Sequence, residues 1–229
     1  MKKARYRAGN FLIRYQHGAY ALLYLAVYLL WFCYLEKTVI RDFTVIHMAV
    51  DDYIPFLEVF VIPYFLWFPY VAAAILFLLL RNKSDYCRAF LFLAAGMTVF
   101  LLVSTLWPNG QHLRPFVMPR NNLFTQLVSA LYRRDTPTNL WPSIHVYNSI
   151  GVHAALMKSK ELETKKGIRL ASFLLCVSII LATVLIKQHS MFDVLTAFGM
   201  AVVMYVIVYQ PMALRLPLRS REKPKPRLP

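Results

Sequence analysis

Long apolar stretches constrain this chain more than any other feature of its sequence. Six stretches are dominated by apolar residues, and roughly 20 such residues let a helix cross the apolar core of a bilayer. Apolar and aromatic residue types make up 59% of the 229 positions, and charged residues only 16%. A soluble domain has about 45–50% apolar and about 25% charged residues. The stretches cover residues 18–35, 54–80, 89–107, 141–157, 168–186 and 189–209.

These stretches predict an all-α polytopic membrane protein with a bundle of six transmembrane helices. The fourth stretch is short and carries polar residues, which a span tolerates where neighbouring helices cover it. No repeat and no Gly-rich linker divides the chain, so we expect one membrane domain over residues 18–210. The compact size and short loops are typical of an integral protein of the bacterial plasma membrane.

Basic residues indicate how the bundle is oriented. Lys and Arg number 26 against 11 Asp and Glu, for a formal net charge of +15. If all six stretches span, the basic segments 1–17, 81–88, 158–169 and 211–229 share one side, which is cytoplasmic because basic loops are retained there. Both termini are then cytoplasmic, as a basic N-terminal arm (1–17) and a basic tail (211–229). In so apolar a chain, this charge is expected to meet anionic lipid and not nucleic acid.

Residues 36–53, 108–140 and 187–188 then lie on the extracytoplasmic side. Within the longest of these segments, Leu123, Leu127, Val128 and Leu131 recur at helical spacing. This pattern predicts a helix over residues 121–134 that lies in the membrane interface. Loops of this length usually do more than connect two helices.

Three ionisable residues fall at the outer ends of predicted spans, where such residues are costly and usually functional. His145 lies at the start of the fourth stretch, and His189 opens the sixth. Asp193 follows His189 by one helical turn, so both side chains share a face. The topology therefore brings two histidines and a carboxylate to the same membrane surface.

These residue types suit phosphoryl transfer through a covalent phosphohistidine. A neutral imidazole can attack phosphorus when a carboxylate holds its other nitrogen, as Asp193 can for His189. His145 can protonate the departing oxygen. The negative charge of the transferred group needs fixed donors, which Arg114, Lys187 and two helix N-termini can provide.

Three segments resemble the signatures of the type-2 phosphatidic acid phosphatase superfamily. They read LRPF with Arg114, PSIH with Ser143 and His145, and KQHSMFD with His189 and Asp193. Their order, their spacing and their positions at outer helix ends are similar to the family's six-helix plan. The shortened pattern of two histidines and an aspartate looks like the lipid phosphotransferase branch, which contains inositol phosphorylceramide synthase and sphingomyelin synthase.

The signatures also depart from the family pattern at three places. The lysine expected seven residues before Arg114 is Trp107, and the glycine of the second signature is Ile144. The Ser-Arg pair that opens the third signature falls on residues 182–183, which are Ala and Thr. Lys187 is placed to stand in for the missing arginine.

The resemblance implies a lipid phosphatase or a phospho-head-group transferase with an extracytoplasmic active site. His189 would be the nucleophile, Asp193 its orienting partner, and His145 first the acid for the leaving group and then the base for the acceptor. Arg114 and Ser143 would bind phosphate. The family works without a metal or an organic cofactor, and membrane lipids would be both substrate and acceptor. The sequence does not identify the lipid substrate or the oligomeric state. It also does not decide whether the acceptor is water or a lipid.

Other interpretations of the same residues stay open. His189 and Asp193 alone could form a capped helix start with a buried pair, and as metal ligands they would lack a third ligand other than His145. Asp51 and Asp52 could contact a polar head group, although a helix cap before the second span is the simpler interpretation. The remaining histidines are expected in helix packing or at the interface: His17, His47, His112 and His153.

A different class of function is a small transporter or lipid scramblase that uses the polar residues as a proton relay. Against it, the polar residues gather at one face, and no paired broken helices appear in the two halves. A non-catalytic assembly factor is a third interpretation, and it would make the three signatures a coincidence.

Overall fold

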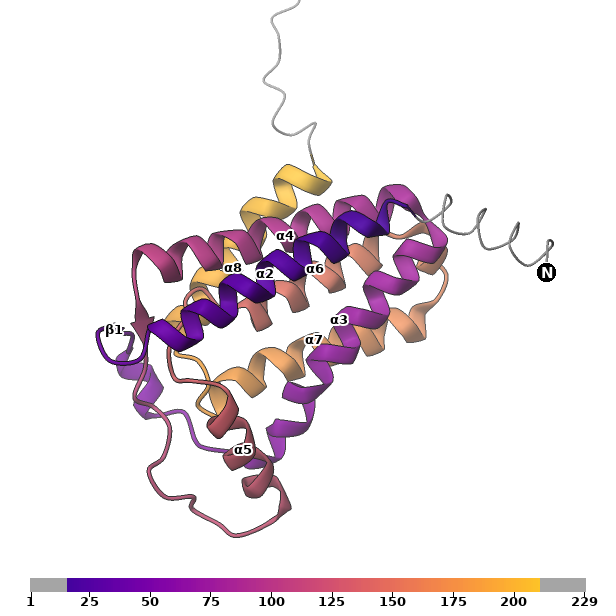
Figure 1. Ribbon diagram of the computed structural model, residues 1–229. Helices are drawn as coiled ribbons and strands as arrows, with labels where there is room; N and C mark the ends of the chain where they lie inside the picture. Colours follow the sequence, from indigo (N-terminus) through magenta and orange to yellow (C-terminus); the bar gives the residue numbers. More distant parts are fainter. Residues whose placement is uncertain (1–15, 211–229) are drawn as a thin grey trace, which may run out of the picture.

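The computed structural model describes residues 16–210, which are mostly helical (Figure 1). The predicted tail (211–229), and all of the predicted N-terminal arm except residues 16 and 17, lie outside the described residues. Two-residue strands β1 (Thr44–Val45) and β2 (Asn109–Gly110) pair in parallel, and short 3-10 turns cover Ala49–Asp52, Glu58–Phe60 and Lys160–Leu162. The α-helices are α2 (Gly18–Thr38), α3 (Val61–Arg81), α4 (Lys83–Leu106), α5 (Leu123–Arg134), α6 (Ile144–Lys158), α7 (Lys166–Leu185) and α8 (Met191–Tyr209).

Five helices of the described part are long and apolar enough to cross a membrane. They are α2, α3 with the 3-10 turn before it, α4, α7 and α8. These helices are compatible with the predicted integral membrane protein. The fourth predicted stretch forms α6, which has only 15 residues and is short for a helix that spans alone. The six spans and the cytoplasmic termini therefore stay predictions.

Two predicted spans begin later in the structure than the sequence pattern indicated. The second was expected from residue 54, but the segment before the 3-10 turn is irregular, and the Leu57 amide donates to Leu185 O at 2.9 Å. The sixth was expected to open at His189. Ser190 is instead the N-cap of α8, and its Oγ accepts from Phe192 N at 3.1 Å. His189 therefore lies in the turn between α7 and α8, one residue before the cap.

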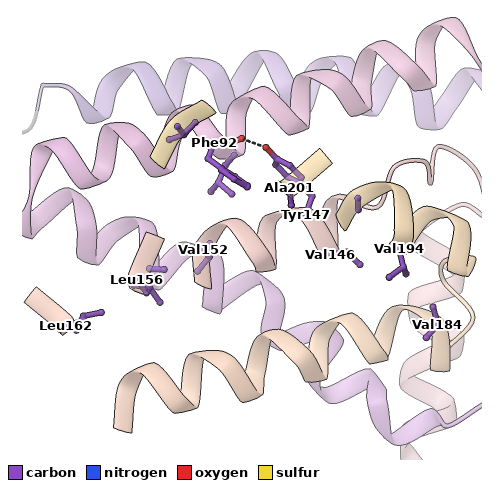
Figure 2. Packing of buried hydrophobic residues seen from close by; sticks show 13 residues of the cluster. Phe92, Val146, Tyr147, Val152, Leu156, Leu162, Val184, Val194 and Ala201 are labelled. Atoms are coloured by element: carbon purple, nitrogen blue, oxygen red, sulfur yellow. Dashed lines mark hydrogen bonds between the residues drawn. The ribbon is translucent and has the colours of Figure 1, made fainter. Parts of the chain in front are cut away.

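The short helix α6 lies at the centre of the bundle. It packs against α3, α4, α7 and α8. The rings of Phe92 in α4 and Tyr147 in α6 stack at 4.8 Å between centroids, and Tyr147 Oη donates to Phe92 O at 2.8 Å (Figure 2). A Cβ atom at Gly96 would overlap the Tyr147 ring, and one at Gly151 would overlap Phe92. Glycine at these two positions thus lets α4 and α6 approach closely.

One end of the bundle holds the starts of α3, α6 and α8 and the ends of α2, α4 and α7 (Figure 1). We call it the cap end, and we call residues 39–60 and 107–143 the cap. The β1–β2 pair joins the two segments of the cap, with Thr44 opposite Asn109 and Val45 opposite Gly110. The cap therefore connects elements that lie far apart in the sequence.

The helix predicted over residues 121–134 is confirmed as α5. Its N-cap is Asn122, whose Oδ1 accepts from Thr125 N at 2.9 Å. On the side toward the bundle, Val128 is fully buried and packs in a cluster with Val61 of α3 and Ile186 after α7. The location of α5 in a membrane interface stays a prediction.

Candidate functional site

The two histidines that the sequence singled out meet at the cap end of the bundle. His189 Nε2 lies 3.5 Å from His145 Nδ1, and the ring centroids are 5.6 Å apart. His189 Nδ1 lies 3.3 Å from Asp193 Oδ2. Asp193 is fully buried and His189 is only 4% exposed. Two imidazoles and a carboxylate thus form one continuous chain of polar contacts.

Capping at the start of α8 fixes the orientation of the His189 ring. Asp193 is the third residue of the helix, and its Oδ2 accepts from Ser190 N at 3.0 Å while it faces His189 Nδ1. Because an ionised carboxylate only accepts hydrogen bonds, this contact places the imidazole proton on Nδ1. Nε2 is then unprotonated, as a nucleophilic nitrogen must be, and it faces His145.

His145 lies in the first turn of α6. Ser143 is the N-cap of this helix, and its Oγ accepts from Val146 N at 3.4 Å. Ser143 N donates to Asp193 O at 3.3 Å, so the starts of α6 and α8 are tied together. The His145 ring packs between Tyr64 and Trp67 of α3, at centroid distances of 4.6 and 4.5 Å. Its position is therefore set by three different helices.

Asp51 is not the cap of the second span that the sequence suggested; it caps α8. Its carboxylate accepts from Met191 N at 2.8 Å, Ser190 Oγ at 2.5 Å and Met48 N at 2.8 Å. The 3-10 turn that carries Asp51 folds onto the start of α8, and the side chain is 1% exposed. Asp52 points outward and pairs with His47 at 2.8 Å. Of the two aspartates, only Asp52 is open to a polar head group.

Replacing Asp51 with Ala is expected to destabilise the fold strongly. Three donors would lose a buried charged acceptor, and one such hydrogen bond is worth about 1.5–3 kcal/mol. With a loss of about 3 kcal/mol, the thermal midpoint of the detergent-solubilised protein should fall by roughly 6–12 °C.

The matched control for this prediction is Asp52→Ala. Its partner pair is exposed, and pairs of this kind contribute less than about 1 kcal/mol. Equal shifts of the thermal midpoint in the two variants would contradict the role of Asp51.

Arg114 lies in the cap, where most of its guanidinium group is engaged by the chain itself. NH1 donates to Asp135 O at 2.7 Å and to Tyr132 O at 3.4 Å, and NH2 donates to Thr136 O at 3.1 Å and Gln188 Oε1 at 2.5 Å. The group also lies 4.5 Å from the centre of the Tyr132 ring. Its Nε is buried and has no acceptor among the described residues. The guanidinium group that was predicted to bind phosphate thus donates mainly to cap residues, and the Nε–H remains for a ligand.

Charges around Arg114 are coupled through Gln188. The Gln188 amide donates to Asp135 Oδ2 at 3.0 Å. Burial lowers the pKa of Arg114, and the nearby Asp135 carboxylate opposes this shift. Burial raises the pKa of Asp135, and the Arg114 charge opposes that shift. Gln188 is adjacent to His189, so this network connects the cap to the turn that carries the histidine.

Lys187 occupies the reversal between α7 and α8. Its φ is 54°, a left-handed conformation that is uncommon outside Gly. Its Nζ donates to Asp51 O at 2.7 Å, and burial lowers its pKa while Asp51 and Asp52 oppose this. An ammonium group has three protons, so two further hydrogen bonds are available. Lys187, which the sequence predicted to bind phosphate, therefore lies in the turn between α7 and α8, and its Nζ contacts the cap.

Several residues of the site were not singled out by the sequence. Tyr64 and Trp67 flank His145, and their spacing of three residues in α3 places them on one helix face. No sequence pattern marks Gln188 or Asp135 as part of the site, apart from the position of Gln188 in the KQHSMFD segment and of Asp135 directly after α5. The pairing of Asp135 with Gln188 is a long-range contact, which one sequence does not reveal.

Among the described residues, no group of three His, Cys, Asp or Glu side chains could hold a metal ion. Comparison with protein-family models, with curated proteins and with solved structures gave no match for this chain.

Proposed function

We propose that this chain is an integral-membrane lipid phosphatase or phosphotransferase, similar to the type-2 phosphatidic acid phosphatase superfamily and its lipid phosphotransferase branch. One observation carries the proposal: His189 Nε2 faces His145 Nδ1 at 3.5 Å while Asp193 lies against the other nitrogen of His189. This arrangement supports the proposal that His189 is the nucleophile, Asp193 its orienting carboxylate and His145 the proton carrier.

In the first step, His189 Nε2 attacks the phosphorus of a phospholipid or lipid phosphate. The N–P bond forms while the P–O bond to the leaving lipid breaks. A protonated His145 gives its proton to the departing oxygen, so that a neutral lipid alcohol leaves. Asp193 stabilises the positive charge that develops on the His189 ring.

The second step returns the enzyme to its starting state. The oxygen of water or of a lipid hydroxyl attacks the phosphohistidine, and His145 takes the proton from that oxygen. The N–P bond then breaks and His189 Nε2 is free again. With a lipid phosphate as donor, water as acceptor gives a phosphatase. With a phospholipid as donor, a lipid hydroxyl as acceptor gives a head-group transferase.

Donors near the histidine pair suit the charge of the transferred group. The amides of Ile144 and His145 open α6 and have no acceptor among the described residues, and the same holds for Arg114 Nε. Lys187 Nζ retains two protons. Catalysis of this type depends mainly on positioning and electrostatic stabilisation, and these groups supply both at the cap end.

The proposed topology has six crossings, with α6 as the fourth. The helix is short, but four helices surround it, so its polar residues meet protein and not lipid. Both termini then lie in the cytoplasm, and the cap and the histidines lie on the extracytoplasmic side. This orientation follows from the basic loops, and the membrane is proposed to be a bacterial plasma membrane.

One observation favours the second candidate, a transporter or scramblase with a proton relay. Two turns below His145 in α6, His153 Nδ1 lies 3.0 Å from Ser172 Oγ, which lies 2.8 Å from Tyr70 Oη. These polar groups extend the polar path of α6 deeper into the bundle. A relay would make a flux across liposomes depend on His153.

The test is to incubate the detergent-purified protein with ³²P-labelled phosphatidate or with a phospholipid labelled in its head-group phosphate, with and without added ceramide. We expect a water-soluble labelled product from hydrolysis, which is free phosphate from phosphatidate and a phosphorylated head group from the phospholipid, or a new labelled lipid that forms only with acceptor from a transferase. Folded protein that forms neither product, but moves lipid or protons across liposomes in a His153-dependent manner, would replace the proposal by the second candidate.

A further inference from the structure

A second polar cavity lies in the cap, away from the histidine pair. Its volume is about 540 Å³, and it lies between α5 and the connection from β2 to α5. Two arginines, Arg120 and Arg133, line it together with the side chains of Asn121, Gln126 and Ser129. No acidic residue lines it. The cavity thus combines positive charge with amide and hydroxyl groups, which is the chemistry that binds a phosphate.

The helix α5 separates this cavity from the bundle. Gln126, Ser129 and Arg133 are three and four residues apart and form one stripe of the helix. The residues that pack inward, among them Val128 and Tyr132, occupy a different stripe. In Figure 1 the connection from β2 swings outward past α5 at the end of the bundle opposite the N-terminus. The cavity is therefore on the outer side of α5.

A buried carboxylate holds the wall of the cavity in place. Arg120 NH1 donates to Glu58 Oε2 at 2.6 Å, and Asn122 Nδ2 donates to Glu58 Oε1 at 2.9 Å. Glu58 is only 6% exposed, whereas more than half of the Arg120 side chain is exposed. One face of Arg120 is thus anchored, and the rest of its guanidinium group remains for a ligand. Arg133 is exposed and makes no hydrogen bond or ion pair within the described residues.

Large exposed apolar side chains occur in the two segments that form this cavity. Phe116 is fully exposed, Val117 is 81% exposed and Leu123 is 66% exposed. Val117 also lines the cavity itself. Exposed apolar residues beside a basic pocket suit a membrane surface, where the apolar groups enter the lipid and the cations meet the head groups. Binding of a free soluble anion would not explain why these apolar residues are exposed.

We propose that this cavity binds the phosphate-bearing head group of a phospholipid at the membrane surface, with Phe116 and Val117 inserted beside it. The phosphate would lie between Arg120 and Arg133. Gln126 and Asn121 would hydrogen-bond to the polar part of the head group. The site requires no chemistry at His189, so its test is separate from the test of phosphoryl transfer.

The test uses the full-length protein in detergent, with bound lipid counted by native mass spectrometry during titration with phosphatidylglycerol. Glycerol phosphate and diacylglycerol serve as the head group alone and the apolar part alone. Arg133→Gln is expected to weaken phosphatidylglycerol binding about tenfold or more, because a charge-assisted contact is lost. Phe116→Ser should weaken it as well.

Arg134→Gln is the matched control, because Arg134 is the next residue of α5 and does not line the cavity. We expect this variant to bind phosphatidylglycerol like the unmodified protein. Equal effects of the Arg133 and Arg134 substitutions would overturn the site. If glycerol phosphate binds as tightly as phosphatidylglycerol and Phe116→Ser has no effect, the cavity binds a free anion, and the proposal of a phospholipid as its ligand is wrong.

Discussion

Replacing His189 with Ala should abolish phosphate release and head-group transfer together, by a factor of about 10⁴ or more, as is usual when an enzyme loses its nucleophile. Both reactions pass through the same N–P bond in the proposed mechanism. Loss of the imidazole removes the atom that forms this bond, whichever acceptor is used. The measurement is the initial rate of product formation from a labelled phospholipid, with and without an acceptor lipid.

Two controls separate this effect from misfolding. His47→Ala removes a histidine that is exposed and paired only with Asp52, and it should retain nearly full activity. The thermal midpoint of His189→Ala should stay close to that of the unmodified protein, because the His189 amide still donates to Thr183 O. A well-folded His189→Ala protein with near-normal turnover would eliminate His189 as nucleophile.

Replacing Asp193 with Asn should lower kcat by about 10²–10⁴-fold and change KM little. An Asn oxygen can still accept from Ser190 N, so the capping box survives. The same oxygen position faces His189 Nδ1, so the Asn oxygen also keeps this contact and the proton on Nδ1. The variant instead loses the negative charge that stabilises the imidazolium form of His189 as it develops during attack.

The split between kcat and thermal stability gives the decisive readout for a positioning residue. Because the capping box survives in the Asn variant, its thermal midpoint should stay close to that of the unmodified protein while kcat falls. Asp193→Ala serves as comparison, because it also removes the capping box and should lower the thermal midpoint. An Asn variant with kcat within threefold of the unmodified protein would show that Asp193 serves only as a cap.

Local patterns predicted much of the fold because they act within one helix. The apolar runs of α2, α4 and α7 and the helical spacing that became α5 each depend on neighbours in sequence. The spacing of His189 and Asp193 also predicted their pairing, on the expectation that both lie in one helix. In the structure the pairing has a different cause: the capping box at Ser190 places His189 before the helix, and the Asp193 carboxylate faces its ring.

Long-range contacts were not predictable in the same way. Asp51 caps the start of α8, although its residue type and its position in the sequence suggested only a cap for the second span. Arg114 donates to three backbone carbonyl groups at the end of α5 and just after it. A sequence shows which groups need partners but not which distant segment supplies them. The aromatic contacts of His145 with Tyr64 and Trp67 depend in the same way on how α3 packs against α6.

The central claim is a covalent phosphohistidine at residue 189, and rapid-quench labelling tests it most directly. The protein is mixed with phospholipid that carries ³²P in its head-group phosphate, and the reaction is stopped in alkali within one turnover. Peptide mapping then locates the label. The mechanism predicts an alkali-stable, acid-labile phosphate on His189, absent from His189→Ala. Label on another residue, or full turnover with no labelled protein at any time, would contradict it.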